Sequence, residues 1–172
     1  MRSDKCIYKK TIDMINNDDI SEEEKKKRIS VVDKIIAEKD ISKRYSILYD
    51  MICDYLDNEF QSNNICGFKD GICSRRQDMI DRGIKKECYL NGCCYGYKEG
   101  KTCDYLIDGH CSIKNIACKT FTCPYLRKKG YKFSINKIYF AKYFFNIAQK
   151  VYMEHTHFVD KDIVMKGIMK LK

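Results

Sequence analysis

Nine of the chain's eleven cysteines lie between residues 66 and 123, and this clustering constrains the fold more than any other feature of the sequence. The same stretch holds most of the glycines and ends beside the only proline, Pro124. It has few aliphatic residues and many turn residues, so it is poorly suited to folding by burial of an apolar face. We therefore expect a metal, an iron–sulfur cluster or disulfides to hold it together.

Composition and the first residues favour a metal over disulfides. The chain is 44% hydrophobic and 33% charged, which is typical of a soluble globular protein. Its first residues mix both charge signs and lack the apolar core of a secretion signal, and the longest apolar run, 138–148, is too short to span a membrane. We expect a cytoplasmic protein with no membrane partner, in which thiols stay reduced. Eleven is also an odd number, so the cysteines cannot all pair within one chain.

The cysteine spacing predicts the ligands but leaves the metal open. Pairs such as Cys118 and Cys123, separated by four residues, fit zinc hairpins. The Cys123-Pro124 dipeptide resembles the close of many cluster-binding runs, although the usual C-x2-C-x2-C spacing is absent. Neighbouring side chains diverge, so the adjacent Cys93 and Cys94 indicate as many as two sites. The predicted ligands are Cys73, Cys88, Cys93, Cys94, Cys103, Cys111, Cys118 and Cys123, with Cys66 as a weaker candidate.

The flanking segments have helical periodicity, and we expect a single domain over residues 1–172. Residues 1–64 form its helical N-terminal part, 65–133 its cysteine-rich segment and 134–172 its C-terminal helices. The predicted helices cover roughly 3–17, 21–38, 42–63, 74–82, a long span from 134 to about 152, and 160–171. The first part should also bury Cys53 as a core thiol. The fold class is mainly α, with helices packed around an irregular, metal-ordered cysteine-rich segment and little or no sheet.

Three residues mark the ends of these predicted helices. Ser21 should cap the second helix and form a capping box with Glu24, and Ser42 should cap the third. Gly83 is placed to end the short helix from residue 74.

The net charge of +9 is unevenly distributed. Residues 1–62 carry −2, residues 63–133 carry +7 and residues 134–172 carry +4. We interpret the positive middle block as compensation for metal-bound thiolates. A nucleic-acid surface is a lower alternative, because no motif of a known binding module accompanies the charge.

One run of the sequence resembles a known family. This run is similar to the pattern of bacterial cysteine-cluster proteins of the YkgJ-like group, described as a zinc- or iron-chelating domain. The matching residues are Cys93-Cys94, Cys103-Asp104-Tyr105-Leu106, His110-Cys111-Ser112-Ile113 and Cys118. The likeness covers about a fifth of the chain. Ile116-Ala117 stands where that family has Arg-Pro, and the close Cys-x-x-Cys upstream of the pair is missing. One branch of the group is similar to flagellin lysine N-methylases, so the resemblance also implies an enzymatic alternative.

These observations predict a cysteine-ligated metal-binding protein that serves as a structural or interaction module, with an unknown protein as its partner. The alternative is an iron–sulfur redox protein or enzyme, including a methylase-like activity. The expected cofactor is zinc or an iron–sulfur cluster. The sequence identifies no catalytic residue.

Overall fold

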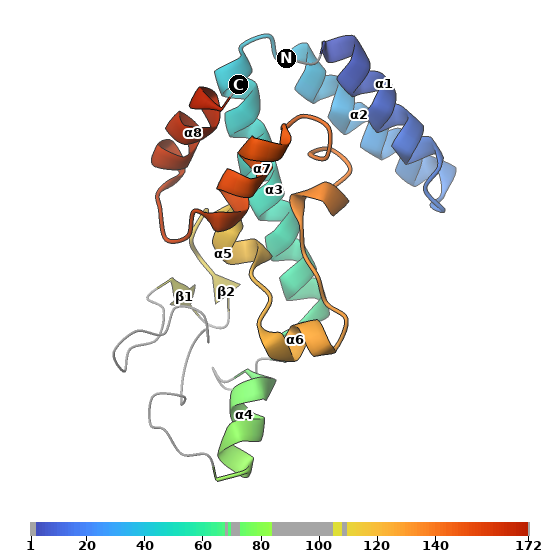
Figure 1. The fold of residues 1–172 in the computed structure, drawn as a ribbon. Coiled ribbons are helices and arrows are strands. Elements are labelled where there is room, and N and C mark those ends of the chain that lie inside the picture. Colours follow the sequence, from blue (N-terminus) through green and yellow to red (C-terminus); the bar gives the residue numbers. More distant parts are fainter. Residues whose placement is uncertain (1–2, 68, 70–72, 84–104, 108–109, 172) are drawn as a thin grey trace.

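The computed structural model describes residues 3–67, 69, 73–83, 105–107 and 110–171, and these are mainly helical, as predicted. Figure 1 shows the long helix α3 at the centre, with α1 and α2 on one side of its upper half, α8 on the other side and α7 in front of it. The helices are α1 (Asp4–Asn16), α2 (Glu22–Ala37), α3 (Ile41–Asn63), α4 (Ser74–Asp81), α5 (Ile116–Thr120), α6 (Pro124–Lys128), α7 (Ile147–His155) and α8 (Lys161–Lys170).

Side-chain caps start the first three helices. The Ser21 hydroxyl accepts a hydrogen bond from the Glu24 amide at 3.2 Å and so caps α2 as predicted. The Glu24 carboxylate does not complete a capping box; it accepts from Arg28 Nε at 3.1 Å instead. The prediction that Ser42 caps α3 was wrong, because the Asp40 carboxylate accepts from the Lys43 amide at 3.0 Å and α3 begins at Ile41.

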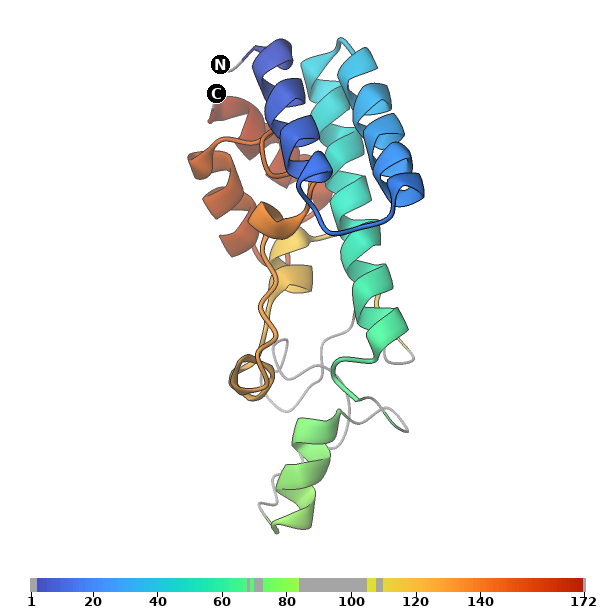
Figure 2. The same ribbon diagram turned by 90° about the vertical axis from the view of Figure 1, so that its right-hand side faces the viewer.

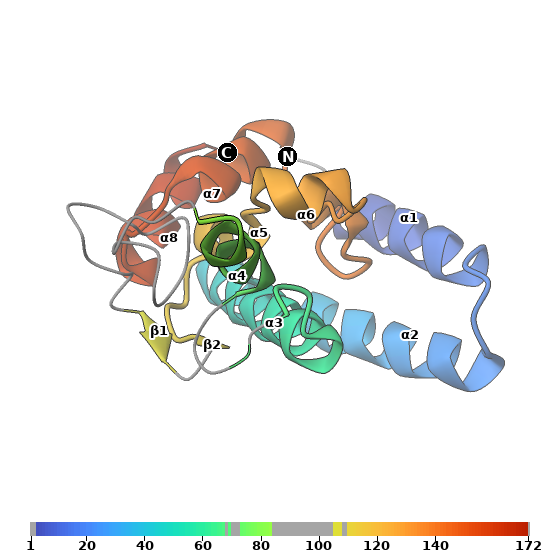
Figure 3. The same ribbon diagram turned by 90° about the horizontal axis from the view of Figure 1, so that it is seen from below.

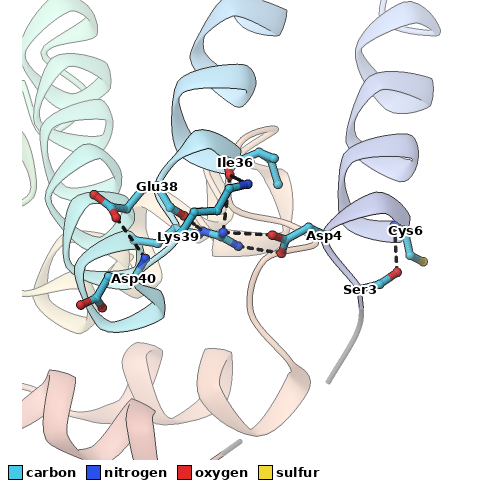
Figure 4. Close-up of polar contacts among 8 residues, drawn as sticks. Ser3, Asp4, Cys6, Ile36, Glu38, Lys39 and Asp40 are labelled. Atoms are coloured by element: carbon cyan, nitrogen blue, oxygen red, sulfur yellow. Dashed lines mark hydrogen bonds and ion pairs between the residues drawn. The ribbon is translucent and has the colours of Figure 1, made fainter.

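A buried arginine, Arg44, joins the ends of these helices, and Figure 4 labels its partners Asp4, Ile36 and Glu38. The Arg44 guanidinium donates to both carboxylate oxygens of Asp4, at 2.7 and 3.0 Å, and its Nε donates to the Glu38 carbonyl at 2.8 Å. Its exposed fraction is 5%. These bonds tie the start of α1 and the end of α2 to the first turn of α3, and they satisfy a charge that would be costly to bury alone.

The core lies along α3 and draws on both ends of the chain. The apolar residues Leu48, Tyr49 and Ile52 recur at helical spacing on α3 and have no exposed surface, and the ring centroids of Tyr45 and Phe145 lie 5.0 Å apart. Figure 2 shows α1, α2 and α3 side by side, with the C-terminal segments covering another side of α3. The remaining buried core residues of this cluster include Ile7, Ile15, Val32, Ile35, Leu56, Ile116, Ile135, Ile138, Phe140, Phe144, Met153, Val164 and Ile168.

The end of the cysteine-rich segment contains two helices that the sequence did not predict. Helix α5 is integrated into the main core: Ile116 has no exposed surface and Ala117 has 1%. Figure 3 shows α5 between α3 and α7. The expectation that this segment buries no apolar face was therefore wrong for its last part, because Ile113, Ile116 and Ala117 supply such a face.

The predicted long helix from residue 134 was also wrong. Ile135–Lys137 forms a short 3-10 helix, turns follow to residue 145, and α7 begins only at Ile147. A reciprocal capping box starts α7: Asn146 Oδ1 accepts from the Gln149 amide at 2.8 Å, and the Gln149 side chain accepts from the Asn146 amide at 2.9 Å. Aromatic residues occur on several sides of this turn segment. Their spacing in the sequence therefore resembles that of a buried helix.

Sheet is almost absent from the described residues. Leu106–Ile107 (β1) and His110–Cys111 (β2) form one antiparallel pair, with Leu106 opposite Cys111. Helix α4 ends at Asp81, and Gly83, the residue predicted to end it, follows two positions later with a φ of +68°. It lies beyond the lower end of α3 (Figures 1 and 2).

Candidate metal centre

The chain turns sharply where α3 ends. The Gly67 amide donates to the Asn64 carbonyl at 2.7 Å, and Gly67 has a φ of +56°, a conformation that favours glycine. A Cβ at this position would lie 2.6 Å from Ser74 Oγ. The Ser74 amide and hydroxyl both donate to the Cys66 carbonyl, at 2.9 and 2.8 Å. This turn therefore brings the backbone at Cys66 next to the first residue of α4, which follows Cys73.

Two of the predicted cysteines share a small apolar cluster, distant in sequence from each other. Ile65, Cys123 and Leu126 form its buried part, and Cys66 is among the half-buried residues packed against it. The Phe60 and Phe133 rings, 4.7 Å apart, also belong to this cluster. We call the cluster the lower core; its members are Phe60, Ile65, Cys66, Phe121, Cys123, Tyr125, Leu126 and Phe133.

Cys73 and Cys123 each occupy the position just before a helix. The Cys73 carbonyl accepts from the Gln77 amide at 3.1 Å, and the Cys123 carbonyl accepts from the Arg127 amide at 3.0 Å. Pro124 occupies the first position of α6, where its missing N–H costs no helical hydrogen bond. Cys73 is 7% exposed and Cys123 is 6% exposed. Both positions are therefore fixed by local backbone geometry and shielded from solvent.

Cys118 lies on α5, closer to the middle of α3 than the lower core is. Its amide donates to Asn115 Oδ1 at 2.9 Å. Burial raises the pKa of Tyr49, and the nearby Cys53 and Cys118 contribute to that increase.

The other predicted ligands are less defined by the structure. Cys111 belongs to the backbone pair β1–β2. Cys88, Cys93, Cys94 and Cys103 lie outside the described residues. Among the residues that the structure describes, no three His, Cys, Asp or Glu side chains form a group that could hold a metal. A complete site at the lower core would therefore need cysteines from the rest of the predicted set.

Two cysteines, Cys6 and Cys53, lie outside the cysteine-rich segment and differ in burial. Cys53 has no exposed surface, which confirms its prediction as a core thiol, and burial raises its pKa to about 12. A thiol with such a pKa stays protonated at neutral pH and is a poor nucleophile. Cys6 is half-buried on α1, and its amide donates to Ser3 Oγ at 3.3 Å.

Helix α5 ties the cysteine-rich segment to the helical body through side chains that the sequence analysis missed. Asn115 is fully buried, and its Nδ2 donates to the Thr156 and Val159 carbonyls at 2.8 and 2.9 Å. The Ile116 amide donates to the Tyr49 hydroxyl at 3.3 Å. No sequence signal marks Asn115, because its partners are backbone atoms more than forty residues away.

Three carboxylates along one face of α3 form ion pairs with later lysines. Asp50 binds Lys161 at 2.6 Å and Asp54 binds Lys114 at 2.5 Å. Asp57 binds Lys119, whose side chain is only 2% exposed. The helical spacing of the three aspartates can be recognised in the sequence, but the lysines that pair with them cannot.

The ion pairs change the interpretation of the positive middle block. Two of its lysines neutralise carboxylates of α3, so compensation of thiolates is not the only use of this charge.

Comparison with protein-family models, with curated proteins and with solved structures found no match. Within the described ranges, no helix has the length and apolar character needed to cross a membrane.

Proposed function

We propose that this chain is a cysteine-ligated metal-binding protein, in which the metal orders the cysteine-rich segment and the helical body presents that segment to a protein partner. The observation that carries the proposal is the lower core. Cys66 and Cys123 are far apart in sequence but belong to one small cluster. The amide of Ser74, the residue after Cys73, donates a hydrogen bond to the Cys66 carbonyl.

The donor chemistry supports this function. Thiolates are preferred ligands of zinc and of iron–sulfur clusters, and a shielded site at the edge of an apolar cluster limits exchange with water. We infer that Cys66, Cys73 and Cys123 contribute from the described part of the chain. The remaining ligands would come from Cys88, Cys93, Cys94, Cys103, Cys111 and Cys118. When bound, the metal would supply the folding free energy that the segment before β1 cannot obtain from apolar burial.

An iron–sulfur protein is the second candidate. The Cys123-Pro124 step favours it, since Pro124 directly follows the cysteine and starts α6. A redox function, or an enzyme of the methylase-like kind that the resemblance implies, would then replace the purely structural one.

The first prediction tests the ligands and the metal together. Protein purified without oxygen should contain bound zinc by elemental analysis, or absorb near ~400 nm if it holds a cluster. Cys123→Ser should lose the metal of at least one site, because a serine hydroxyl does not replace a thiolate ligand. Cys6→Ser should retain the full content, because Cys6 lies on α1 outside the lower core.

A second cysteine variant separates ligation from folding. Cys53→Ala alters a buried thiol of the main core and should lower the free energy of unfolding without changing the metal content of the folded fraction. Equal metal content in wild type, Cys123→Ser and Cys73→Ser would contradict the proposed function.

A further inference from the structure

A run of the sequence between Asp108 and Glu154 contains nine Lys or Arg residues and no Asp or Glu. Seven of these nine cations fall into two groups, and the other two, Lys142 and Lys150, are half-buried. Lys114 and Lys119 form ion pairs with carboxylates of α3. A second group lies on α6 and in the segment that follows it, and all its members are exposed: Arg127, Lys128, Lys129, Lys132 and Lys137.

These five cations lie in one short segment, 127–137, and together with Tyr131 we call them the basic strip. Lys137 Nζ donates to the Lys132 carbonyl at 3.1 Å, so the 3-10 helix is held against the segment after α6. Among the residues that the structure describes, no carboxylate forms an ion pair with any of the five. The nearby Glu154 accepts from Ser134 Oγ and the Ile135 amide, at 2.9 and 2.8 Å.

The backbone fixes the shape of the strip. The Tyr131 amide donates to the Leu126 carbonyl at 3.1 Å, and the Gly130 amide donates to the Arg127 carbonyl at 3.0 Å. With Gly130 at a φ of +88°, this pair of bonds is a Schellman motif that ends α6. Leu126 is buried in the lower core, so the motif anchors the strip to the fold.

Aromatic rings accompany the charges. The Tyr131 side chain is 39% exposed. Lys129 Nζ lies 4.4 Å from the centre of the Tyr125 ring, which is half-buried. An exposed ring flanked by cations is the combination that binds single-stranded nucleic acid, because the cations contact phosphates while a base stacks on the ring.

We propose that the basic strip is a binding surface for single-stranded nucleic acid. Five exposed cations in one short segment, none of them paired with a carboxylate of the described ranges, would attract a chain of phosphates. Tyr131 would supply a stacking surface that does not depend on base identity, so the recognition would be sequence-tolerant. This surface is independent of the metal proposal, since none of its residues is a proposed ligand.

The composition of the strip favours nucleic acid over a membrane. Binding to an anionic membrane normally combines cations with exposed aliphatic or aromatic side chains that enter the lipid. In the described segment from 124 to 137, Tyr131 is the exposed large apolar residue, while Leu126 and Ile135 are buried.

The second prediction uses the full-length protein and labelled oligothymidine and oligouridine of about 20 nucleotides, long enough to cover one binding site. Fluorescence anisotropy should detect binding at about 50 mM salt that weakens as salt rises. The triple variant Arg127→Gln, Lys128→Gln, Lys132→Gln should weaken binding at least about tenfold and reduce the slope of log affinity against log salt by about 2, since each phosphate contact on a single strand contributes about 0.7.

Matched controls separate the strip from net charge. Lys9→Gln, Lys34→Gln, Lys166→Gln removes the same charge from exposed positions on α1, α2 and α8, and should change the affinity less than about twofold. Tyr131→Ala should weaken binding about tenfold with an unchanged salt slope, because it removes stacking and no charge, whereas Tyr131→Phe should bind like wild type. Circular dichroism should show the same folded spectrum for all variants.

Several results would overturn the proposal. A wild-type protein that binds neither oligonucleotide at about 50 mM salt would overturn it. Equal losses in the two triple variants would show that only net charge matters. Equally tight binding to polyglutamate or to phosphatidylserine vesicles, with no effect of Tyr131→Ala, would indicate a general anion surface or a membrane surface instead.

Discussion

Arg44 shows how one buried charge can hold three helices. Its guanidinium is planar and presents donors in two directions, so it can bind the Asp4 carboxylate with two bonds and still reach the Glu38 carbonyl. A lysine would supply one point charge and could not replace this geometry. The hydrogen bond from Arg44 is the largest cause of a lowered pKa at Asp4.

The third prediction follows from that pKa. Because the folded-state pKa of Asp4 lies below its usual value of 3.8, the ion pair contributes full stability above that pH and loses it as the pH falls through the folded-state pKa. Asp4→Asn should therefore be less stable than wild type at pH 7, and the difference should shrink below about pH 4. Urea midpoints between about pH 7 and about pH 2.5 measure this.

Arg44→Met provides the control for the same experiment. In that background Asp4→Asn should have little effect at any pH, because the partner of the carboxylate is gone. A pH-dependent difference that persists unchanged alongside Arg44→Met would show that another group lowers the pKa of Asp4.

At the level of elements, the C-terminal hairpin of α7 and α8 depends on a close approach between the two helices. A Cβ at Gly167 would lie 2.3 Å from atoms of the Tyr152 ring. Gln149, which is 1% exposed, adds a bond from its Nε2 to the Ile168 carbonyl at 3.1 Å. Each helix also carries a large apolar residue on its outer surface, since Ile147 is 80% exposed and Ile163 is 54% exposed.

The fourth prediction concerns the sign of one substitution. Gly167→Ala should destabilise the wild-type protein by about 1–3 kcal/mol, because the added methyl group overlaps the Tyr152 ring. In a Tyr152→Ala background the same change should stabilise by about 1 kcal/mol, because alanine is the better helix former once the ring is absent. Thermal or urea unfolding of the four proteins of this cycle measures both values. Destabilisation of equal size in both backgrounds would show that the ring is not the obstacle.

At the level of the whole molecule, α3 organises the fold. One part of its surface packs in the apolar core, and its three paired aspartates bind lysines that follow the cysteine at position 111. The ion pairs and the Asn115 bonds therefore join parts of the chain that local interactions cannot connect. Loss of one of these contacts should affect global stability in proportion to its burial.

The fifth prediction compares two aspartates of this face. Asp57→Asn should cost about 2 kcal/mol or more, because its partner Lys119 has a nearly buried side chain. Asp54→Asn should cost less than about 1 kcal/mol, because both members of its pair with Lys114 are more than half exposed. Chemical denaturation in low and high salt checks this. Equal costs for the two substitutions would contradict the difference in burial as the cause.

The sequence alone determined most helices and part of the candidate site. Periodicity located α1, α2, α3, α4 and α8, and a cluster of thiols implied a ligand set, because helix periods and ligand types are local properties of the chain. The division of residues 134–152 into turns and α7 was not predictable in the same way. There the apolar residues serve a core whose other side is formed by distant helices.

Only the tertiary structure decided which distant residues meet. Cys66 and Cys123 share the lower core, Asn115 binds the loop between α7 and α8, and three aspartates of α3 find their lysines. It also showed that Lys114 and Lys119 form ion pairs with α3, whereas the cations from 127 to 137 form none with a carboxylate of the described ranges. These facts depend on how the chain returns to α3, and a pattern of residue types contains no information about the partner that a side chain reaches after such a return.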